Sequence, residues 1–226
     1  MRPRAHLKTL ALLFCATNGL FASGEQPDHL MPVPYETGIT AKYRKLVYKH
    51  LLVTPAQFGR MIWEPGFSEP EWAVSVYGVG ATHESTQPYH SYYVTFTGSL
   101  DSIWGALPQN GERHKQKPIR VTRKDTAITP ALAFAVQAAW RAMLSRTRVE
   151  EERFRGFIFM DAPTAEFTLG SQRGEITPPR KGLTDEMYEI ATTLATLCDV
   201  PAAQRSAKEK KLIRRLSTFE RKAQKA

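Results

Sequence analysis

The sequence predicts an α+β protein, with an antiparallel sheet of about five to six strands and helices packed on one face. Three observations lead to this prediction. Stretches rich in β-branched and aromatic residues come in runs, amphipathic helical stretches come in runs of their own, and the two kinds do not alternate as they do in parallel α/β sheets. The chain has no internal repeat, and the roughly 200 residues after its N-terminal segment suffice for one domain with its own core.

The first half of the chain is expected to contain two helices and three strands. A helix is predicted over 41–51, because its apolar residues recur at helical spacing and Thr40 can cap its start. A short helix is predicted over 54–61, which opens with Thr54-Pro55, a favoured pairing at a cap and first helical position. Alternating apolar and β-branched residues predict strands at 72–77, 92–97 and 118–123, with a helical turn at 100–107.

The second half is expected to contain a long helix, a strand meander and two further helices. The long helix is predicted over 130–146, where Thr129 provides the cap and a proline occupies the first position. A meander of short strands is predicted over 156–177, with its turns at clusters of glycine and proline. The remaining elements are a helix over 185–198, capped by Thr184, and a terminal helix over about 203–223.

Residues 1–24 have the three parts of a secretory signal peptide. A basic start without acidic residues leads into an apolar stretch over 10–16, small residues follow at 22–24, and the composition turns polar at Glu25. We therefore expect cleavage near Gly24-Glu25 and an exported protein, either periplasmic or secreted. The alternative is a membrane-tethered protein that keeps this segment as an uncleaved anchor, although the apolar run is short for a membrane span.

The cysteine content agrees with a fold that relies on its core. Cys15 lies in the predicted signal peptide, so the mature chain keeps only Cys198 and cannot form an internal disulfide. Cys198 lies on the apolar side of a predicted helix, which favours a buried, unreactive thiol. After the signal peptide, we expect a single α+β domain over 25–200 and a basic amphipathic helix over 201–226.

The net charge of the chain is +9, and the excess of basic over acidic residues lies at its two ends. Residues 201–226 contain nine basic and two acidic side chains, whereas residues 25–200 are close to neutral. Because the terminal helix also carries an apolar stripe, it can lie on an anionic envelope surface or bind a protein partner. The alternative is a helix that docks its stripe on the domain and leaves its charges in water. The candidate surface-binding residues are Lys210, Lys211, Arg214, Arg215, Arg221 and Lys222.

The stretch after the strand at 72–77 holds the best candidates for metal ligands. Gly78-Val79-Gly80 begins like a dinucleotide-binding fingerprint, but His83 replaces its third glycine and no helix follows, so a plain loop is favoured. His83, Glu84 and His90 could bind a metal ion in a hydrolase or another metal-dependent enzyme. The two histidines are seven residues apart across a proline, which excludes a zincin helix and makes exposed loop residues the simpler interpretation.

Two further patterns are best explained by turns. Asp161 and Glu166 flank a predicted tight turn, where solvated carboxylates are expected rather than an acid–base pair. Ser171 is not centred between glycines as a nucleophile elbow requires, so residues 170–174 are predicted as a hairpin turn. Without a complete catalytic, cofactor or metal motif, the sequence favours a non-enzymatic binding or structural role. Nucleic acid is a disfavoured partner for an exported protein.

The segment over 155–197 resembles the C-terminal part of uncharacterised bacterial exported proteins of unknown function. In that group, a strand with a glycine and an aromatic residue leads through a hairpin to a strand that ends in proline and then to a terminal helix. The residues that carry the resemblance are Gly156, Phe157, Phe167, Gly174, Pro178 and Pro179. This chain has Glu175-Ile176-Thr177 where an aromatic residue is expected before the proline. The resemblance implies no activity and no site residue.

Overall fold

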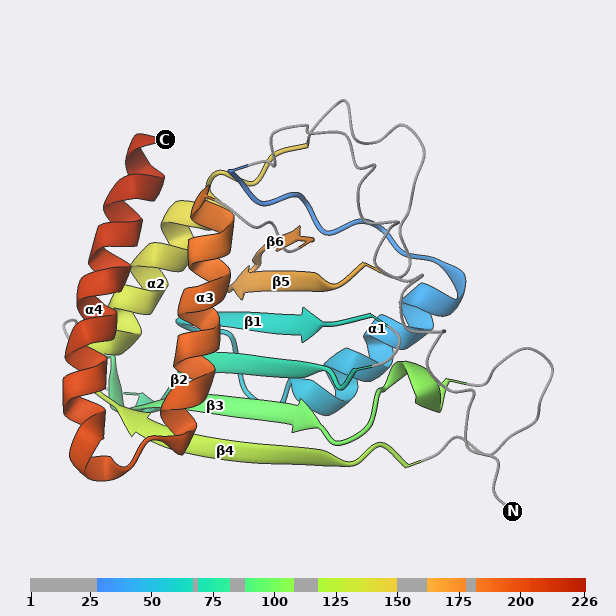
Figure 1. Cartoon of the computed structure of the whole chain (residues 1–226), viewed down its shortest axis with the longest axis horizontal. Coiled ribbons are helices and arrows are strands. Elements are labelled where there is room, and N and C mark those ends of the chain that lie inside the picture. Colours follow the sequence, from blue (N-terminus) through green and yellow to red (C-terminus); the bar gives the residue numbers. More distant parts are fainter. Residues whose placement is uncertain (1–27, 67–68, 82–87, 108–117, 150–161, 178–181) are drawn as a thin grey trace, which may run out of the picture.

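The computed structural model describes residues 28–66, 69–81, 88–107, 118–149, 162–177 and 182–226 (Figure 1). Within these segments, six strands form one antiparallel sheet in the order β4-β3-β2-β1-β5-β6. The strands are β1 (Gly59–Glu64), β2 (Trp72–Ala81), β3 (Tyr89–Ser99), β4 (Val121–Ile128), β5 (Thr164–Leu169) and β6 (Gln172–Ile176). The helices are α1 (Gly38–Leu51), η1 (Trp104–Ala106), α2 (Pro130–Leu144), α3 (Gly182–Thr196), η2 (Leu197–Asp199) and α4 (Ala202–Lys225). The predicted α+β class is confirmed.

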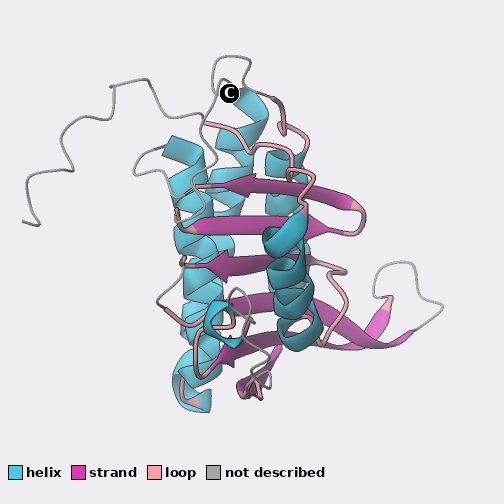
Figure 2. Cartoon of the chain, turned by 90° about the vertical axis from the view of Figure 1, so that its right-hand side faces the viewer, coloured by secondary structure: helices cyan, strands magenta, loops and turns pink. Residues whose placement is uncertain are grey.

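The two faces of the sheet are covered by different helices. α2, α3 and α4 lie on one face, whereas α1 and η1 lie on the other (Figure 2). The side chains of β1 follow this division, because Met61 belongs to the core under α2, whereas its neighbour Ile62 packs with Val47 of α1. The layer of three helices matches the predicted arrangement, and α1 adds a cover for the opposite face.

The long helix α2 forms as predicted because its start carries a complete capping signal. Thr129 Oγ1 accepts a hydrogen bond from the Leu132 N–H at 3.3 Å, and Pro130 occupies the first helical position. The helix buries Trp140, whose Nε1 donates to the backbone oxygen of Arg60 at 3.0 Å. Apolar contact and a hydrogen bond therefore both hold α2 to β1.

The short helix predicted over 54–61 is wrong. Residues 55–58 are not helical, and β1 begins at Gly59, where the φ angle is +142° and a Cβ would meet the ring of Trp140 at 3.1 Å. β1 pairs with β2 on one side and with β5 on the other, and this pairing satisfies its backbone hydrogen-bonding groups. The Thr54-Pro55 signal is local, so long-range strand pairing overrides it.

Two predicted helix caps lie inside their helices instead. α1 begins before Thr40, whose hydroxyl donates to the Thr37 carbonyl oxygen at 2.8 Å. α3 begins before Thr184, which is buried in its first turn. At the start of α3, the Asp28 carboxylate accepts a hydrogen bond from the Leu183 N–H. This acceptor comes from a distant part of the chain, so no local pattern predicts it.

The strands differ from the prediction mainly in their bounds. β2 continues through 78–81, which the sequence predicts as a loop, and β4 begins three residues after the start of the expected strand at 118–123. The β5–β6 hairpin turns at Gly170-Ser171, as predicted for this glycine cluster. The first strand of the predicted meander, at 157–160, lies outside the described residues.

The carboxylate of Glu71 joins three segments at one end of the sheet. It is fully buried, and it accepts hydrogen bonds from the Tyr43 hydroxyl at 2.9 Å and from the Ile103 N–H at 2.8 Å. The hydroxyl of Ser99 donates to it at 3.1 Å. Because α1, the end of β3 and the turn before η1 share this acceptor, its removal would leave several buried donors without a partner.

We expect Glu71→Ala to lower the free energy of unfolding by about 3 kcal/mol, because hydrogen bonds to a charged acceptor are lost and their donors stay buried. The measurement is chemical denaturation followed by circular dichroism. Glu69→Ala, an exposed glutamate two residues earlier, is the matched control and should change stability little. Equal effects of the two variants would show that the contacts of Glu71 do not stabilise the fold.

Candidate functional site

The apolar stripe of α4 is docked in the core of the molecule. Leu212, Leu216, Phe219 and Ala223 are buried, and they belong to the same hydrophobic core as residues of α2 and α3. This is the second of the two arrangements that the sequence allows. The apolar face of α4 is therefore used for folding, and only its other faces can meet a partner.

α4 also supplies an acidic group that caps α2. The buried carboxylate of Glu209 accepts hydrogen bonds from the Thr129 N–H at 3.1 Å and from the Thr129 hydroxyl at 2.8 Å. This places a negative charge at the start of α2, where the helix dipole favours it. One of the two acidic residues of the C-terminal segment is thus used inside the molecule, so the outer surface of α4 is even more basic than the sequence implies.

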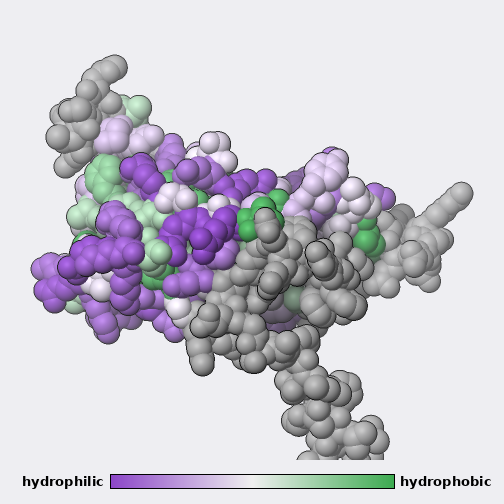
Figure 3. All heavy atoms as spheres, turned by 90° about the horizontal axis from the view of Figure 1, so that it is seen from above, coloured by the Kyte–Doolittle hydropathy of each residue, from purple (hydrophilic) through white to green (hydrophobic). Residues whose placement is uncertain are grey.

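The side of α4 opposite the stripe carries a line of basic residues, here named the α4 basic ridge: Lys210, Arg214, Arg221 and Lys225. All four are exposed, and their spacing of four, seven and four residues places them along one side of the helix. The ridge is about 22 Å long at the rise of an α-helix. Figure 3 shows mostly hydrophilic residues at the left-hand end of the molecule, where α4 lies in Figure 1.

Two of the six predicted surface-binding residues are directed toward α3 instead of outward. Arg215 forms an ion pair with Glu189, and Lys222 Nζ lies 2.8 Å from the carboxylate of Glu186. Lys211 is exposed beside the ridge. The predicted set therefore divides into four residues that face solvent and two that help to hold α4 against α3.

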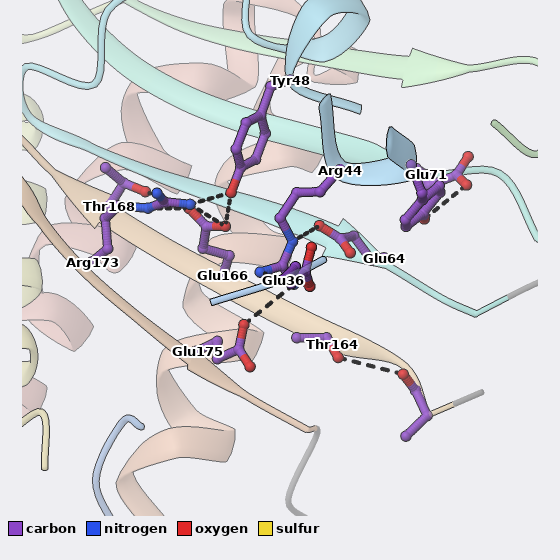
Figure 4. A network of polar contacts seen from close by, with 12 residues as sticks. Glu36, Arg44, Tyr48, Glu64, Glu71, Thr164, Glu166, Thr168, Arg173 and Glu175 are labelled. Carbon is purple, nitrogen blue, oxygen red and sulfur yellow. Dashed lines mark hydrogen bonds and ion pairs between the residues drawn. The ribbon is translucent and has the colours of Figure 1, made fainter. Parts of the chain in front are cut away.

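A second polar site lies on the opposite face of the sheet, beneath α1 (Figure 4). The guanidinium of Arg44 in α1 forms ion pairs of 3.2 to 3.4 Å with carboxylates from three different segments. These carboxylates are Glu36 of the N-terminal lead (residues 28–37, which precede α1), Glu64 of β1 and Glu175 of β6. Arg44 and Glu64 are buried. The cluster therefore holds α1 and the lead to the sheet through charges that are shielded from water.

Burial changes the acidity of this cluster. It raises the pKa of Glu64 to about 7, with Arg44 opposing the rise and the neighbouring carboxylates adding to it. Burial likewise raises the pKa of Glu175 to about 7, again against the effect of Arg44. Both carboxyls therefore exchange protons near neutral pH, whereas an ordinary glutamate does so near pH 4.

Beside this cluster, Glu166 of β5 joins β6 to α1. The guanidinium of Arg173 lies 2.9 Å from one oxygen of Glu166, and the Tyr48 hydroxyl donates to the other oxygen at 2.5 Å. Burial, followed by the charge of Glu166, raises the pKa of Tyr48 above its ordinary value. Only 2% of Glu166 is exposed, so the prediction of a solvated carboxylate is wrong for this residue. Asp161, its predicted neighbour, lies outside the described residues.

This cluster is not among the sites predicted from the sequence, although the strands carry a signal for it. Charged residues recur at alternate positions of β1, β5 and β6, which puts them on one face of the sheet: Arg60, Glu64, Glu166, Arg173 and Glu175. Such a face needs a polar or charged cover. The sequence does not indicate that Arg44 of α1 supplies the central positive charge, because that contact depends on how the helix crosses the strands.

The predicted metal ligands are not brought together in the described part of the chain. His83 and Glu84 lie outside it, and His90 is an exposed residue of β3. Within the described segments, no group of three or more His, Cys, Asp or Glu residues is placed to hold a metal ion. A search of the same segments for a helix of membrane-spanning length and apolarity found none. Cys198 is half-buried, and burial raises the pKa of its thiol.

Comparisons with protein-family models, curated proteins and solved structures found no match to this chain. The resemblance of residues 155–197 to exported bacterial proteins therefore stays a prediction. The α4 basic ridge and the cluster around Arg44 are therefore the features from which a function can be inferred.

We expect the protein to lose stability as the pH rises from about 5 to about 8. A carboxyl whose folded-state pKa lies above its unfolded value favours the folded state while it is protonated, and this contribution disappears as the pH passes the folded pKa. For one such carboxyl the loss is about 2 kcal/mol over this range. Urea denaturation at a series of pH values measures it.

The variant Glu64→Gln isolates this effect, because glutamine cannot titrate. The slope of stability against pH should be smaller in Glu64→Gln than in the native chain, whereas Glu69→Gln should keep the native slope. His50 has the opposite effect on the pH dependence of stability, because burial and Lys49 lower its pKa. This effect is common to the native chain and the variants, so the comparison removes it. An unchanged slope in Glu64→Gln would mean that this carboxyl titrates normally.

Proposed function

We propose that the protein is exported and has a non-enzymatic binding role in the cell envelope, with the α4 basic ridge as its contact surface. The observation that carries this proposal is that one side of α4 is buried in the fold, whereas the opposite side is exposed and basic. Its apolar stripe and Glu209 are used by the fold, whereas Lys210, Arg214 and Arg221 are exposed on the far side. A ridge of one charge sign attracts an anionic surface or an acidic protein partner.

Export is the second part of the proposal, and the N-terminal segment supports it. Residues 1–24 combine a basic start, a short apolar stretch and small residues before a polar segment. Outside the cytoplasm, a basic surface meets the anionic components of the envelope rather than nucleic acid. The two parts of the proposal can be tested separately.

The location is tested by the intact mass and N-terminal sequence of the protein recovered from fractionated native cells. We expect a chain that begins near Glu25, recovered from outside the cytoplasm. A full-length chain in the membrane fraction would show that the N-terminal segment is kept as an anchor. A full-length chain in the cytosol would contradict export.

The contact surface is tested by the association of the protein with isolated native envelopes. We expect wild-type protein to sediment with them at low salt and to be released at about 1 M salt, where charges are screened beyond about 3 Å. The triple variant Lys210→Glu/Arg214→Glu/Arg221→Glu should remain in the supernatant. Deletion of α4 is not a suitable test, because it would also remove Leu216 and Phe219 from the core.

The matched control reverses three lysines on the other face of the molecule. Lys42→Glu/Lys45→Glu/Lys49→Glu makes the same change in net charge on the exposed surface of α1. This variant should sediment with envelopes as wild-type protein does. Equal loss in both variants would show that net charge, and not the ridge, governs association, and no sedimentation of wild-type protein would contradict the binding role.

A further inference from the structure

We infer that the anionic partner of the α4 basic ridge is a phospholipid bilayer surface with anionic headgroups, on which α4 lies flat without inserting. This inference rests on the proposed binding role and names its partner. Three properties of the ridge lead to it: its linear shape, the absence of large apolar residues along it, and the burial of the stripe that would otherwise insert.

The shape of the ridge fits a surface of repeated charges better than a single bound anion. Its four basic residues are spread over about 22 Å of one straight helix, so they cannot converge on one phosphate group. Each can instead meet a separate headgroup. The two arginines offer planar guanidinium groups, which suit phosphate oxygens well. The hydroxyl-bearing Ser217 and Thr218 lie between them and are exposed.

The composition of the ridge fits headgroups better than a protein partner. Stable protein interfaces centre on aromatic or other large apolar residues that become fully buried. Along the outer side of α4, Ser217 and Thr218 lie between the basic residues, and the small residues Ala203 and Ala207 precede them. Among the described residues, the exposed large hydrophobic side chains all lie elsewhere. The ridge thus provides charge without an apolar centre.

The docked stripe determines how α4 meets the bilayer. A free amphipathic helix binds membranes by burying its apolar face among the acyl chains. In this protein, Leu216 and Phe219 are fully buried in the core, so insertion would require α4 to leave its place. The contact is therefore electrostatic, and it depends on anionic lipid and on low salt.

The position of α4 separates the ridge from the exposed lysines of α1. α4 belongs to the layer of three helices on one face of the sheet, and α1 lies on the opposite face (Figure 2). The ridge and the exposed lysines of α1 therefore belong to elements on opposite sides of the sheet. This separation makes the lysine variant of α1 a suitable control, because its charges lie on the other side of the sheet.

The experiment is co-sedimentation of the purified protein, in the form that the mass measurement identifies, with lipid vesicles. One set contains phosphatidylcholine alone, and the other contains phosphatidylcholine mixed with phosphatidylglycerol. Binding is measured at about 0.1 M and about 1 M salt. We expect binding only to the mixed vesicles and only at the lower salt. Circular dichroism and thermal unfolding establish beforehand that each variant is folded.

The ridge variant Lys210→Glu/Arg214→Glu/Arg221→Glu should bind the mixed vesicles at least about 100-fold more weakly, since each basic residue near an anionic surface strengthens binding about fivefold. The control Lys42→Glu/Lys45→Glu/Lys49→Glu should bind as wild-type protein does. Equal loss in the control would overturn the assignment of the ridge. Binding to pure phosphatidylcholine, or binding that resists high salt, would overturn the flat, non-inserting mode.

The envelope and vesicle experiments distinguish the failure of this inference from the failure of the proposed function. Association with native envelopes through the ridge, without binding to the mixed vesicles, would overturn the lipid and identify an acidic protein or another polyanion as the partner. Absence of association in both experiments would overturn the binding role itself. Binding in both, lost in the ridge variant alone, would support the two proposals together.

Discussion

The buried charge of Arg44 is the constraint on which the α1 side of the molecule depends. A guanidinium that is removed from water must be paired, and here carboxylates from the N-terminal lead, from β1 and from β6 surround it. β1 and β6 are far from α1 in the chain, so the ion pairs of Arg44 with Glu64 and Glu175 form only when the sheet and α1 are both in place. Two of the carboxylates have a pKa of about 7, which links this part of the fold to pH.

The two faces of the sheet differ in how many charged and polar groups they bury. On the α2 face, apolar side chains such as Trp140 and Phe167 are buried among helices, and their burial contributes stability at any pH. The α1 face also buries an apolar cluster that includes Val47, but it adds charged and hydroxyl groups that contact one another, as around Glu71 and Glu166. Buried charge pairs contribute little net stability, but the loss of one partner is costly. The charge pairs under α1 therefore specify the arrangement of α1 more than they stabilise the fold.

α4 shows how one helix can serve folding and binding on different sides. Its stripe completes the core, Glu209 caps α2, and two of its basic residues pair with α3. The residues of the basic ridge take no part in these contacts, and Arg221 donates hydrogen bonds only to Ser217 and Thr218 of its own helix among the described residues. This separation is the physical basis for the proposed binding role, since substitution of the ridge should leave the core intact.

The sequence by itself determined the class of the fold, the helix over 130–146 and the amphipathic nature of the last helix, because periodicity and capping are local properties that the chain keeps after folding. Only the tertiary structure decided that residues 59–64 form a central strand, that Asp28 caps α3 and that the stripe of α4 is docked. It also decided that Arg44, Glu64 and Glu175 meet. These outcomes depend on contacts between residues far apart in the chain, and the free energy of such contacts exceeds the local preferences that a sequence pattern expresses.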